Sequence, residues 1–412
     1  MTNGWTGGQY SVFRIVFGAY LCVHFLNLAP WGPELFSSGG MLPDASTSPL
    51  AFAFPNVLTA FDPPAFVTAL LLLAAGASIL FAVGWYDRAA AVLVWYVWAC
   101  LLGRNPLILN PGIPYVGWLL LAHAFLPRAP YGSVAARGRP DPGGNWRMPA
   151  MVFAGAWILL SVGYTYSGIT KLVSPSWLDG TAVAHVLENP LARPGPLRAF
   201  ILSLPDSVLR LGTWAALALE LLFAPLALSR RLRPWIWTMA LAMHLGLIAL
   251  IDFADLSLGM VMLHLFTFDP GWVPAMKART IETLFYDGGC GLCHRAVRFL
   301  LAEDHTAGGA FRFAPLGGET FRATVSRPAD LPDSLVLWTD DGRILTRSRA
   351  ALHLGRRLGG LWRVLAGLVG LLPVALLDRA YDAIAHVRHR LFARPEEACP
   401  IAPRELRSRL LA

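Results

Sequence analysis

Long apolar runs separated by short polar connections fill the chain up to about residue 275. Eight runs stand out, near residues 10–30, 65–86, 89–103, 113–127, 149–173, 207–228, 233–251 and 253–268. Several reach the ~20 residues that an α-helix needs to cross a bilayer. The three shortest runs are expected to span or re-enter because longer apolar neighbours surround them. The pattern predicts an α-helical polytopic membrane bundle of about eight spans over residues 1–275.

A different pattern begins at residue 276 and continues to the C-terminus. Residues 283–286 predict a short strand, Asp287-Gly288-Gly289 a turn, and residues 290–301 an amphipathic helix. Further strands are expected at 311–314, 334–338 and 343–346, and helices over much of 349–392. Residues 276–412 are therefore predicted to form a small α/β domain that follows the bundle.

Composition and charge agree with a membrane protein, since 55% of the residues are apolar and 15% are charged. Basic residues gather after the even-numbered runs, at Arg88, Arg128, Arg137, Arg139, Arg147, Arg230, Arg231, Arg233, Lys277 and Arg279. The protein is expected to lie in the inner (plasma) membrane of the cell. Positive charges mark cytoplasmic connections, so both termini are expected in the cytoplasm. The lipid bilayer is the expected partner. The net charge of +8 follows from this topology, and no nucleic-acid partner is expected.

The pair Cys290-Gly291-Leu292-Cys293 lies where the first predicted strand of the C-terminal domain meets a helix. A thiol at a helix N-terminus faces unpaired N–H groups and the positive end of the helix dipole, which favours the thiolate. Cys290 is therefore the candidate nucleophile, and Cys293 lies on the same helical face and can resolve a mixed disulfide. The alternatives are an inert buried pair or half of a zinc site that would need two further ligands, with Cys399 and scattered histidines available.

The residues around this pair resemble the DCC family, predicted thiol–disulfide oxidoreductases named for an Asp-Cys-Cys set, here Asp287, Cys290 and Cys293. The opening segment 285–293 carries the resemblance. Similar residues follow at 298–300, Asp304, 331–337, 341–342, 349–350, Tyr381, 388–392 and Cys399. The resemblance covers nearly all of 280–402 and implies a thioredoxin-like fold, a redox function and a protein or small-thiol redox partner.

By analogy with thioredoxin-like folds, Pro332 is expected to be a substrate-binding cis-proline beside the thiols. The alternative is a plain proline at the start of a strand. Cys399 is the third cysteine of the domain, and it could exchange a disulfide with Cys290 or be a structural residue.

The membrane part contains a second characteristic segment, Tyr164 to Leu172 followed by Trp177-Leu178-Asp179-Gly180. This segment resembles the signature of the HTTM family, whose best-known members are vitamin K-dependent γ-carboxylases. The resemblance extends over about 8–275. It implies that Lys171 occupies the position of the catalytic base, and it makes a quinone the candidate cofactor. The chain departs from the carboxylases at Asn110-Pro111, where they carry a histidine after the asparagine, and this departure speaks against glutamyl carboxylation.

Lys171 also has two structural interpretations. A lysine at the end of an apolar helix can act as a base because desolvation favours its neutral form. It can equally snorkel to the interface or pair with Glu220. The apolar runs also contain four histidines, His24, His123, His244 and His264. Their spacing does not fit a helical metal site, so no metal is predicted, and each histidine is expected to form interhelical hydrogen bonds.

These observations favour a membrane-bound thiol–disulfide oxidoreductase that uses Cys290 and Cys293, with a bundle that binds a quinone or lipid-like ligand near Lys171. One alternative is a vitamin K carboxylase-like lyase. Another is a non-catalytic membrane protein for peptide maturation, immunity or transport, whose C-terminal domain is a binding module. A redox domain needs both cysteines, whereas a binding module should tolerate serine at either position.

Overall fold

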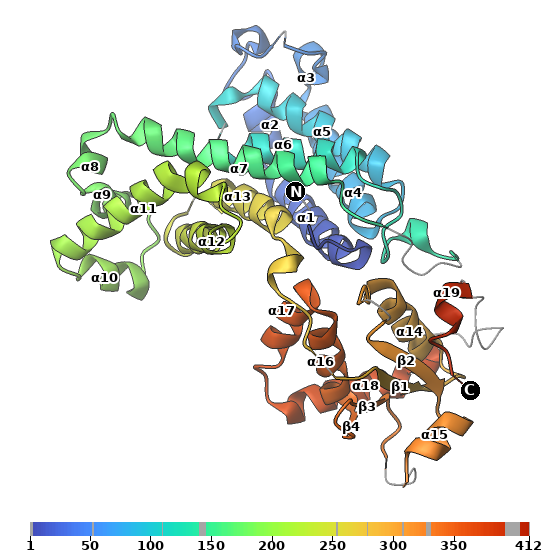
Figure 1. Ribbon diagram of the computed structural model, residues 1–412. Helices are drawn as coiled ribbons and strands as arrows, with labels where there is room; N and C mark the ends of the chain where they lie inside the picture. Colours follow the sequence, from blue (N-terminus) through green and yellow to red (C-terminus); the bar gives the residue numbers. More distant parts are fainter. Residues whose placement is uncertain are drawn as a thin grey trace. The chain divides into compact units, whose positions relative to one another are not determined.

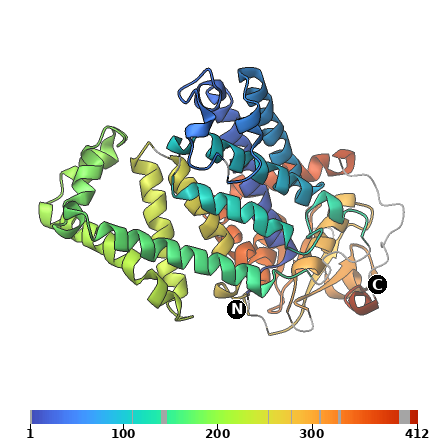
Figure 2. The ribbon, with the colours of Figure 1, turned by 90° about the horizontal axis from the view of Figure 1, so that it is seen from above.

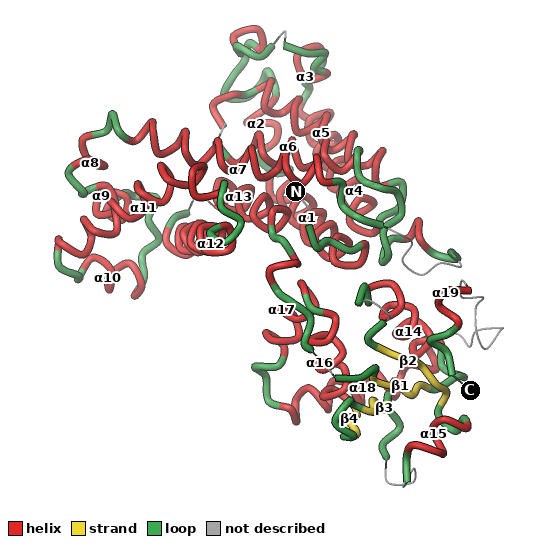
Figure 3. The backbone as a smooth tube through the Cα atoms, in the orientation of Figure 1, coloured by secondary structure: helices red, strands yellow, loops and turns green. Residues whose placement is uncertain are grey.

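The computed structural model describes residues 3–51, 53–108, 110–139, 146–252, 254–277, 279–306, 309–326, 331–391 and 404–411. The chain divides into two compact units. A helical unit holds Phe13–Leu126 and Pro149–Phe268. The other unit, called the dithiol unit below, is assembled from Thr2–Val12, Pro127–Met148 and Asp269–Ala412. Described strands of the sheet occur only in the last of these three stretches (Figure 3).

All eight predicted apolar runs form helices. These are α1 (Gly7–Leu28), α4 (Pro64–Val83), α5 (Asp87–Arg104), α6 (Gly112–Ala124), α7 (Ala150–Lys171), α11 (Asp206–Ala227), α12 (Arg233–Leu250) and α13 (Ala254–Thr267). Short helices lie in the connections: α2 (Gly32–Phe36), α3 (Val57–Ala60), α8 (Pro175–Leu178), α9 (Ala182–Glu188) and α10 (Pro196–Leu202). Helices α7 and α11 pack along each other, as Figures 1 and 2 both show.

Four of the described helices are long and apolar enough to cross a membrane, namely α1, α4, α7 and α11. A fifth candidate is the pair α17 (Gly360–Val369) and α18 (Val374–Leu391), which bends by 112° at the break between them. The predicted count of eight spans is therefore reduced to four or five candidates. Helix α5 carries three charges within its length, and α6 and α13 have only 13 and 14 residues. At about 1.5 Å per residue, the two short helices α6 and α13 do not reach across a ~30 Å hydrocarbon core.

The sheet of the dithiol unit has the strand order β2-β1-β3-β4. Its strands are β1 (Glu282–Tyr286), β2 (Phe311–Pro315), β3 (Val336–Trp338) and β4 (Ile344–Thr346). Strand β1 pairs in parallel with β2 and antiparallel with β3, and β4 is antiparallel to β3. All four strands were predicted, with β3 shorter than expected. The small α/β domain after the helical region is confirmed.

Alternation along β1 sends successive side chains to opposite faces of the sheet and so builds two cores. Leu284 packs in one core with Phe313 and the two cysteines of the CxxC segment. Phe285 packs in the other core, on the opposite face. Full burial of each large apolar side chain contributes about 1.5–3 kcal/mol, so the core that contains the dithiol is also a main source of the domain's stability.

Two helices of this domain lie between its strands, and the others follow the last strand. The helices are α14 (Gly291–Glu303), α15 (Glu319–Thr324), α16 (Arg347–Leu358), α17, α18 and α19 (Arg404–Arg407). Helix α14 connects the parallel strands β1 and β2, which makes a βαβ unit with the cysteines at its first junction. Helix α18 packs against both α14 and α16.

The buried carboxylate of Glu303 holds the N-terminal stretch onto the rest of the dithiol unit. It accepts hydrogen bonds from the Thr6 hydroxyl, from the Gly8 amide at 2.8 Å and from the Trp362 indole at 2.7 Å. Burial raises the pKa of Glu303, although these hydrogen bonds oppose the rise. The first amides of a helix have no intrahelical acceptor, so Glu303 at the end of α14 caps the start of α1.

A candidate dithiol site

A tight turn after β1 positions the first cysteine. The Asp287 carboxylate accepts a hydrogen bond from the Gly289 amide at 2.8 Å, and the Asp287 carbonyl accepts one from the Cys290 amide at 3.2 Å. Cys290 is the N-cap residue of α14, with φ −106° and ψ 115°. Its sulfur accepts a hydrogen bond from the Cys293 amide at 3.4 Å. The sulfur thus occupies the place of a capping oxygen, among the amides that stabilise a negative charge.

The two cysteines differ in their environment although both are buried free thiols. Burial raises the pKa of Cys293 to about 12, and the neighbouring Cys290 sulfur adds to the rise, while the positive charge of Arg388 opposes it. Cys293 therefore stays protonated at neutral pH. The roles of Cys290 as the attacking thiol and of Cys293 as the resolving thiol stay predictions.

His294 closes the turn from the other side. Its Nε2 atom lies 2.9 Å from the Gly288 carbonyl, and because a carbonyl only accepts, this nitrogen carries the proton. The imidazole ring also contacts the Tyr286 ring edge to face, with centroids 5.5 Å apart. His294 thus fixes the turn that presents the dithiol.

Arg388 on α18 is a residue of this site that the sequence alone did not assign. Its guanidinium donates to the Asp333 carboxylate at 2.5 Å and to the Asp333 carbonyl at 3.3 Å, and it lies 3.8 Å from the Asp287 carboxylate. On the same helix, the Tyr381 hydroxyl accepts a hydrogen bond from the Leu335 amide at 3.0 Å. Positions 381 and 388 are two helical turns apart and share one face, and this spacing was the available signal.

Pro332 precedes β3 in a loop, and its predicted cis conformation is wrong. None of the peptide bonds in the described part of the chain is cis. Strand β3 starts only at Val336, so Pro332 lies outside the ladder, and α18 holds the loop through Asp333 and Leu335. Binding of substrate by Pro332 stays a prediction. Cys399 lies outside the described residues.

In the helical unit, Lys171 forms an ion pair with Glu220, which was one of the three roles considered for it. At the end of α7, its amine donates to Glu220 at 2.5 Å and to Ser167 at 2.7 Å, and it lies 4.9 Å from the centre of the Trp177 ring. Glu220 on α11 is buried. The pair joins α7 to α11, and a role for Lys171 as a base stays a prediction.

Two buried histidines lie close together in this unit. The Tyr164 hydroxyl is 2.7 Å from Nε2 of His264, and the rings of His244 and His264 are 5.9 Å apart. Among the described residues, both ring nitrogens of His244 and Nδ1 of His264 have no hydrogen-bond partner. The predicted interhelical contact is present at His264 and at His123, which faces Asp87, but the prediction is wrong for His244. The described residues contain no group of three or more side chains suited to a metal ion.

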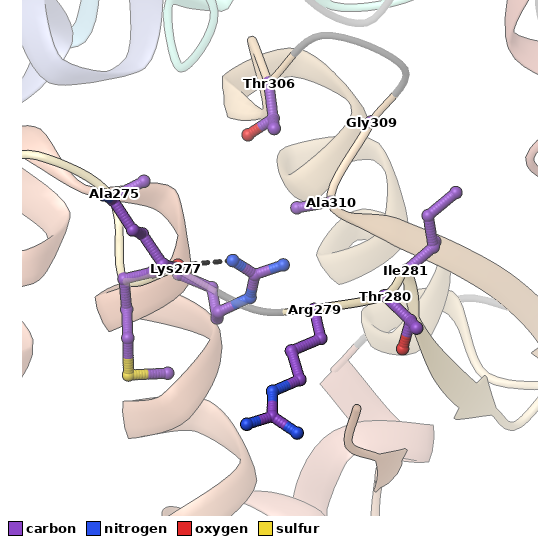
Figure 4. A pocket seen from close by; sticks show the side chains of 10 residues that line it. Ala275, Lys277, Arg279, Thr280, Ile281, Thr306, Gly309 and Ala310 are labelled. Atoms are coloured by element: carbon purple, nitrogen blue, oxygen red, sulfur yellow. Dashed lines mark hydrogen bonds between the residues drawn. The ribbon is translucent and has the colours of Figure 1, made fainter. Parts of the chain in front are cut away.

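A cavity of about 420 Å³ in the dithiol unit lies beside residues 275–277 and 279–281 (Figure 4). Neither cysteine of the CxxC segment lines it. Its lining includes Lys277, Arg279, Thr306 and Arg357. Arg357 is already engaged, because it pairs with Glu282 at 3.0 Å and donates to the Met276 carbonyl. The dithiol is thus not part of this cavity.

The fold and the site together define a class of protein. A CxxC pair at the strand-to-helix junction of a βαβ unit, with one sulfur at the helix N-terminus, is the arrangement of dithiol redox proteins. The family model of DCC1-like thiol-disulfide oxidoreductases matches residues 284–394. Through this domain, the chain belongs to that family.

Two relatives match part of the chain. One is "Uncharacterized protein YuxK" of Bacillus subtilis, 33% identical over 133 residues, which are 32% of this chain and 93% of the relative. The other is "DCC family protein At1g52590, chloroplastic" of Arabidopsis thaliana, 26% identical over 115 residues, which are 27% of this chain and 66% of the relative. No solved structure matches the chain. The resemblance of residues 8–275 to the HTTM family stays a prediction.

Proposed function

We propose that this protein is a membrane-bound thiol–disulfide oxidoreductase that exchanges electrons with a protein or small-thiol partner through Cys290 and Cys293. The observation that carries the proposal is the position of the dithiol, since the Cys290 sulfur caps α14 and accepts a hydrogen bond from the amide of Cys293, the second thiol. The βαβ position of the pair supports the thioredoxin-like character of the domain.

The reaction proceeds in two exchanges. The Cys290 thiolate attacks a substrate disulfide, which forms a mixed disulfide and releases one substrate thiolate. Cys293 then loses its proton and attacks the Cys290 sulfur, so that the protein disulfide forms and the second substrate thiolate leaves. Two electrons pass from the dithiol to the substrate. Two molecules of a reducing thiol, or one dithiol, then return the protein to its reduced form by the reverse steps and leave as a disulfide.

The proposed location is the inner (plasma) membrane, with both termini in the cytoplasm. Four or five candidate spans and the basic connections support this location. The cytoplasm keeps thiols reduced, so the dithiol would act there as a reductant.

The test measures the reduction potential of the whole chain, solubilised in detergent, by counting free thiols in a series of thiol–disulfide buffers. The native protein should show one reversible two-electron couple, and both Cys290→Ser and Cys293→Ser should abolish it. Cys22→Ser is the matched control, because this cysteine belongs to the helical unit and should leave the couple unchanged. If Cys290 and Cys293 each reacted with the buffer thiol separately and formed no disulfide with each other, or if zinc copurified with the protein, the proposal would be contradicted and a binding module would be favoured.

We propose in addition that the helical unit binds a quinone or lipid-like ligand near Lys171. The supporting observation is the set of three unpartnered imidazole nitrogens on His244 and His264. Each buried polar group without a partner costs about 1–3 kcal/mol, and a ligand with carbonyl or hydroxyl groups would remove this cost.

Solvent extraction of the purified protein followed by mass spectrometry tests this second proposal. The native protein should carry a stoichiometric amphiphile that His244→Ala loses. His185→Ala, which changes an imidazole outside this cluster, should retain the ligand. Equal amounts of the same molecules in the native protein, in both variants and in an unrelated detergent-solubilised protein would contradict the proposal.

A further inference from the structure

We infer that Arg388 is a positioning residue of the dithiol, which balances the negative charge of the reduced site while it holds the Asp287 turn and the loop 331–335 around the sulfurs. This inference rests on the proposed redox function. It concerns a residue that lies far from the CxxC segment in the sequence.

The contacts of Arg388 join three separate segments of the domain. The guanidinium donates twice to Asp333 in the loop before β3, and it lies 3.8 Å from Asp287 in the turn that leads to Cys290. One side chain from α18 therefore links the two loops that border the cysteines. Because a guanidinium is planar and donates in fixed directions, its two hydrogen bonds to Asp333 set the orientation of the loop before β3.

Of the three charged side chains in these contacts, Arg388 is the buried one. Its side chain is only 4% exposed, whereas those of Asp333 and Asp287 are 79% and 33% exposed. Water screens the two more exposed carboxylates more strongly than it screens the guanidinium, so the positive charge of Arg388 is the least screened of the three. Burial alone would lower the pKa of Arg388, but the hydrogen bond and charge of Asp333 outweigh this effect and raise it. The guanidinium therefore stays charged.

Other ionisable groups also lie near the dithiol. His294 donates from Nε2 to the Gly288 carbonyl, Arg295 follows it on α14, and Asp287 and Asp333 are acidic. Burial raises the pKa of the Tyr381 hydroxyl, so this group is neutral at physiological pH. Among the described groups that influence Cys293, Arg388 is the cation that favours the thiolate.

The sign of the charge provides a sharp test. Arg388→Met removes a positive charge, so the pH midpoint for alkylation of the dithiol by a small reagent should rise. One pH unit corresponds to about tenfold slower alkylation at pH 7. Asp333→Asn removes a negative charge beside Arg388, so the midpoint should fall. The reduction potential should become more negative in the first variant and less negative in the second, because the reduced thiolate form loses or gains stability.

Two further variants keep the outcome clear. Arg388→Lys retains the charge and should preserve most of the native midpoint even if its geometry is poorer. Arg347→Met removes another arginine of the domain, which pairs with Asp382 of α18, and should leave the midpoint unchanged. Shifts in the same direction for Arg388→Met and Asp333→Asn, or no shift in either, would overturn the inference. A native protein without a two-electron couple would instead overturn the proposed function.

Discussion

Lys171 illustrates how one side chain can satisfy several sequence interpretations at once. Its amine ends an apolar helix, as a base or a snorkelling lysine would, yet in the structure it pairs with the buried Glu220. A buried carboxylate that loses its counter-charge is costly, because no solvent replaces the lost interaction. Loss of Lys171 should therefore destabilise the protein if the residue is an ion-pair partner, an effect that the roles of base or snorkelling lysine do not predict.

Lys171→Met should lower the stability of the helical unit by about 3–5 kcal/mol, since Glu220 would remain buried and unpaired. The double variant Lys171→Met with Glu220→Met should recover most of this loss, because two apolar side chains of similar length replace the pair. Thermal unfolding of the detergent-solubilised protein, followed by tryptophan fluorescence, measures the difference. If the single variant were as stable as the native protein, a structural role for the pair would be excluded.

The position of the dithiol was predicted from local spacing, and Asp287 was added to the candidate site by the DCC resemblance. A strand, an Asp-Gly-Gly turn and a CxxC lie within one short segment, so the sequence places Asp287, Cys290 and Cys293 together. Arg388 could not be found in this way, because its contacts with Asp333 and Asp287 depend on how α18 packs. The conformation of Pro332 also depends on where β3 begins, and the sequence pattern placed that start two residues too early.

At the scale of elements, the junction of α16 and α17 depends on two consecutive glycines. Gly359 and Gly360 have φ angles of 73° and 54°, in the left-handed region that other residues rarely adopt. A Cβ atom at Gly359 would lie 2.6 Å from the backbone nitrogen of Ala275. The reversal of the chain at this point therefore requires glycine for both conformation and space.

Gly359→Ala should destabilise the dithiol unit by at least about 1–2 kcal/mol, from the left-handed conformation alone. Gly367→Ala is the matched control, because this glycine lies inside α17 with open space around its Cα and should gain up to about 1 kcal/mol of helix propensity. Thermal unfolding of the two variants in parallel measures the contrast. Equal midpoints for both would show that the junction tolerates other conformations.

The helices themselves were predicted well, because each apolar run has the length and composition of one. The number of membrane crossings stays a prediction, because an apolar run identifies a helix but not its environment. Helix α5 has charged residues at both ends, and Arg104 at its C-terminal end is buried and pairs with Asp62 at 2.8 Å. Such an ion pair lets a helix with terminal charges pack inside a protein, which the hydropathy pattern alone does not reveal.

At the scale of the whole molecule, the dithiol unit is discontinuous in the sequence. The last stretch of this unit begins at Asp269, and the two earlier stretches belong to the sequence region that was assigned to the helical bundle. The contributions of Thr2–Val12 and Pro127–Met148 follow from long-range hydrogen bonds, such as those of Glu303 with Thr6 and Gly8. Hydrophobic periodicity describes neighbours along the chain, so it could not indicate this assembly.

The capping of α1 by Glu303 also bears on the order of events during synthesis. Thr6 and Gly8 leave the ribosome long before Glu303 and Trp362 do. Domains that are contiguous in sequence can fold as they emerge, but this unit must wait for its last segment. The start of the first helix therefore spends most of translation without its acceptor. The redox domain is completed only once the helices between its parts have been made.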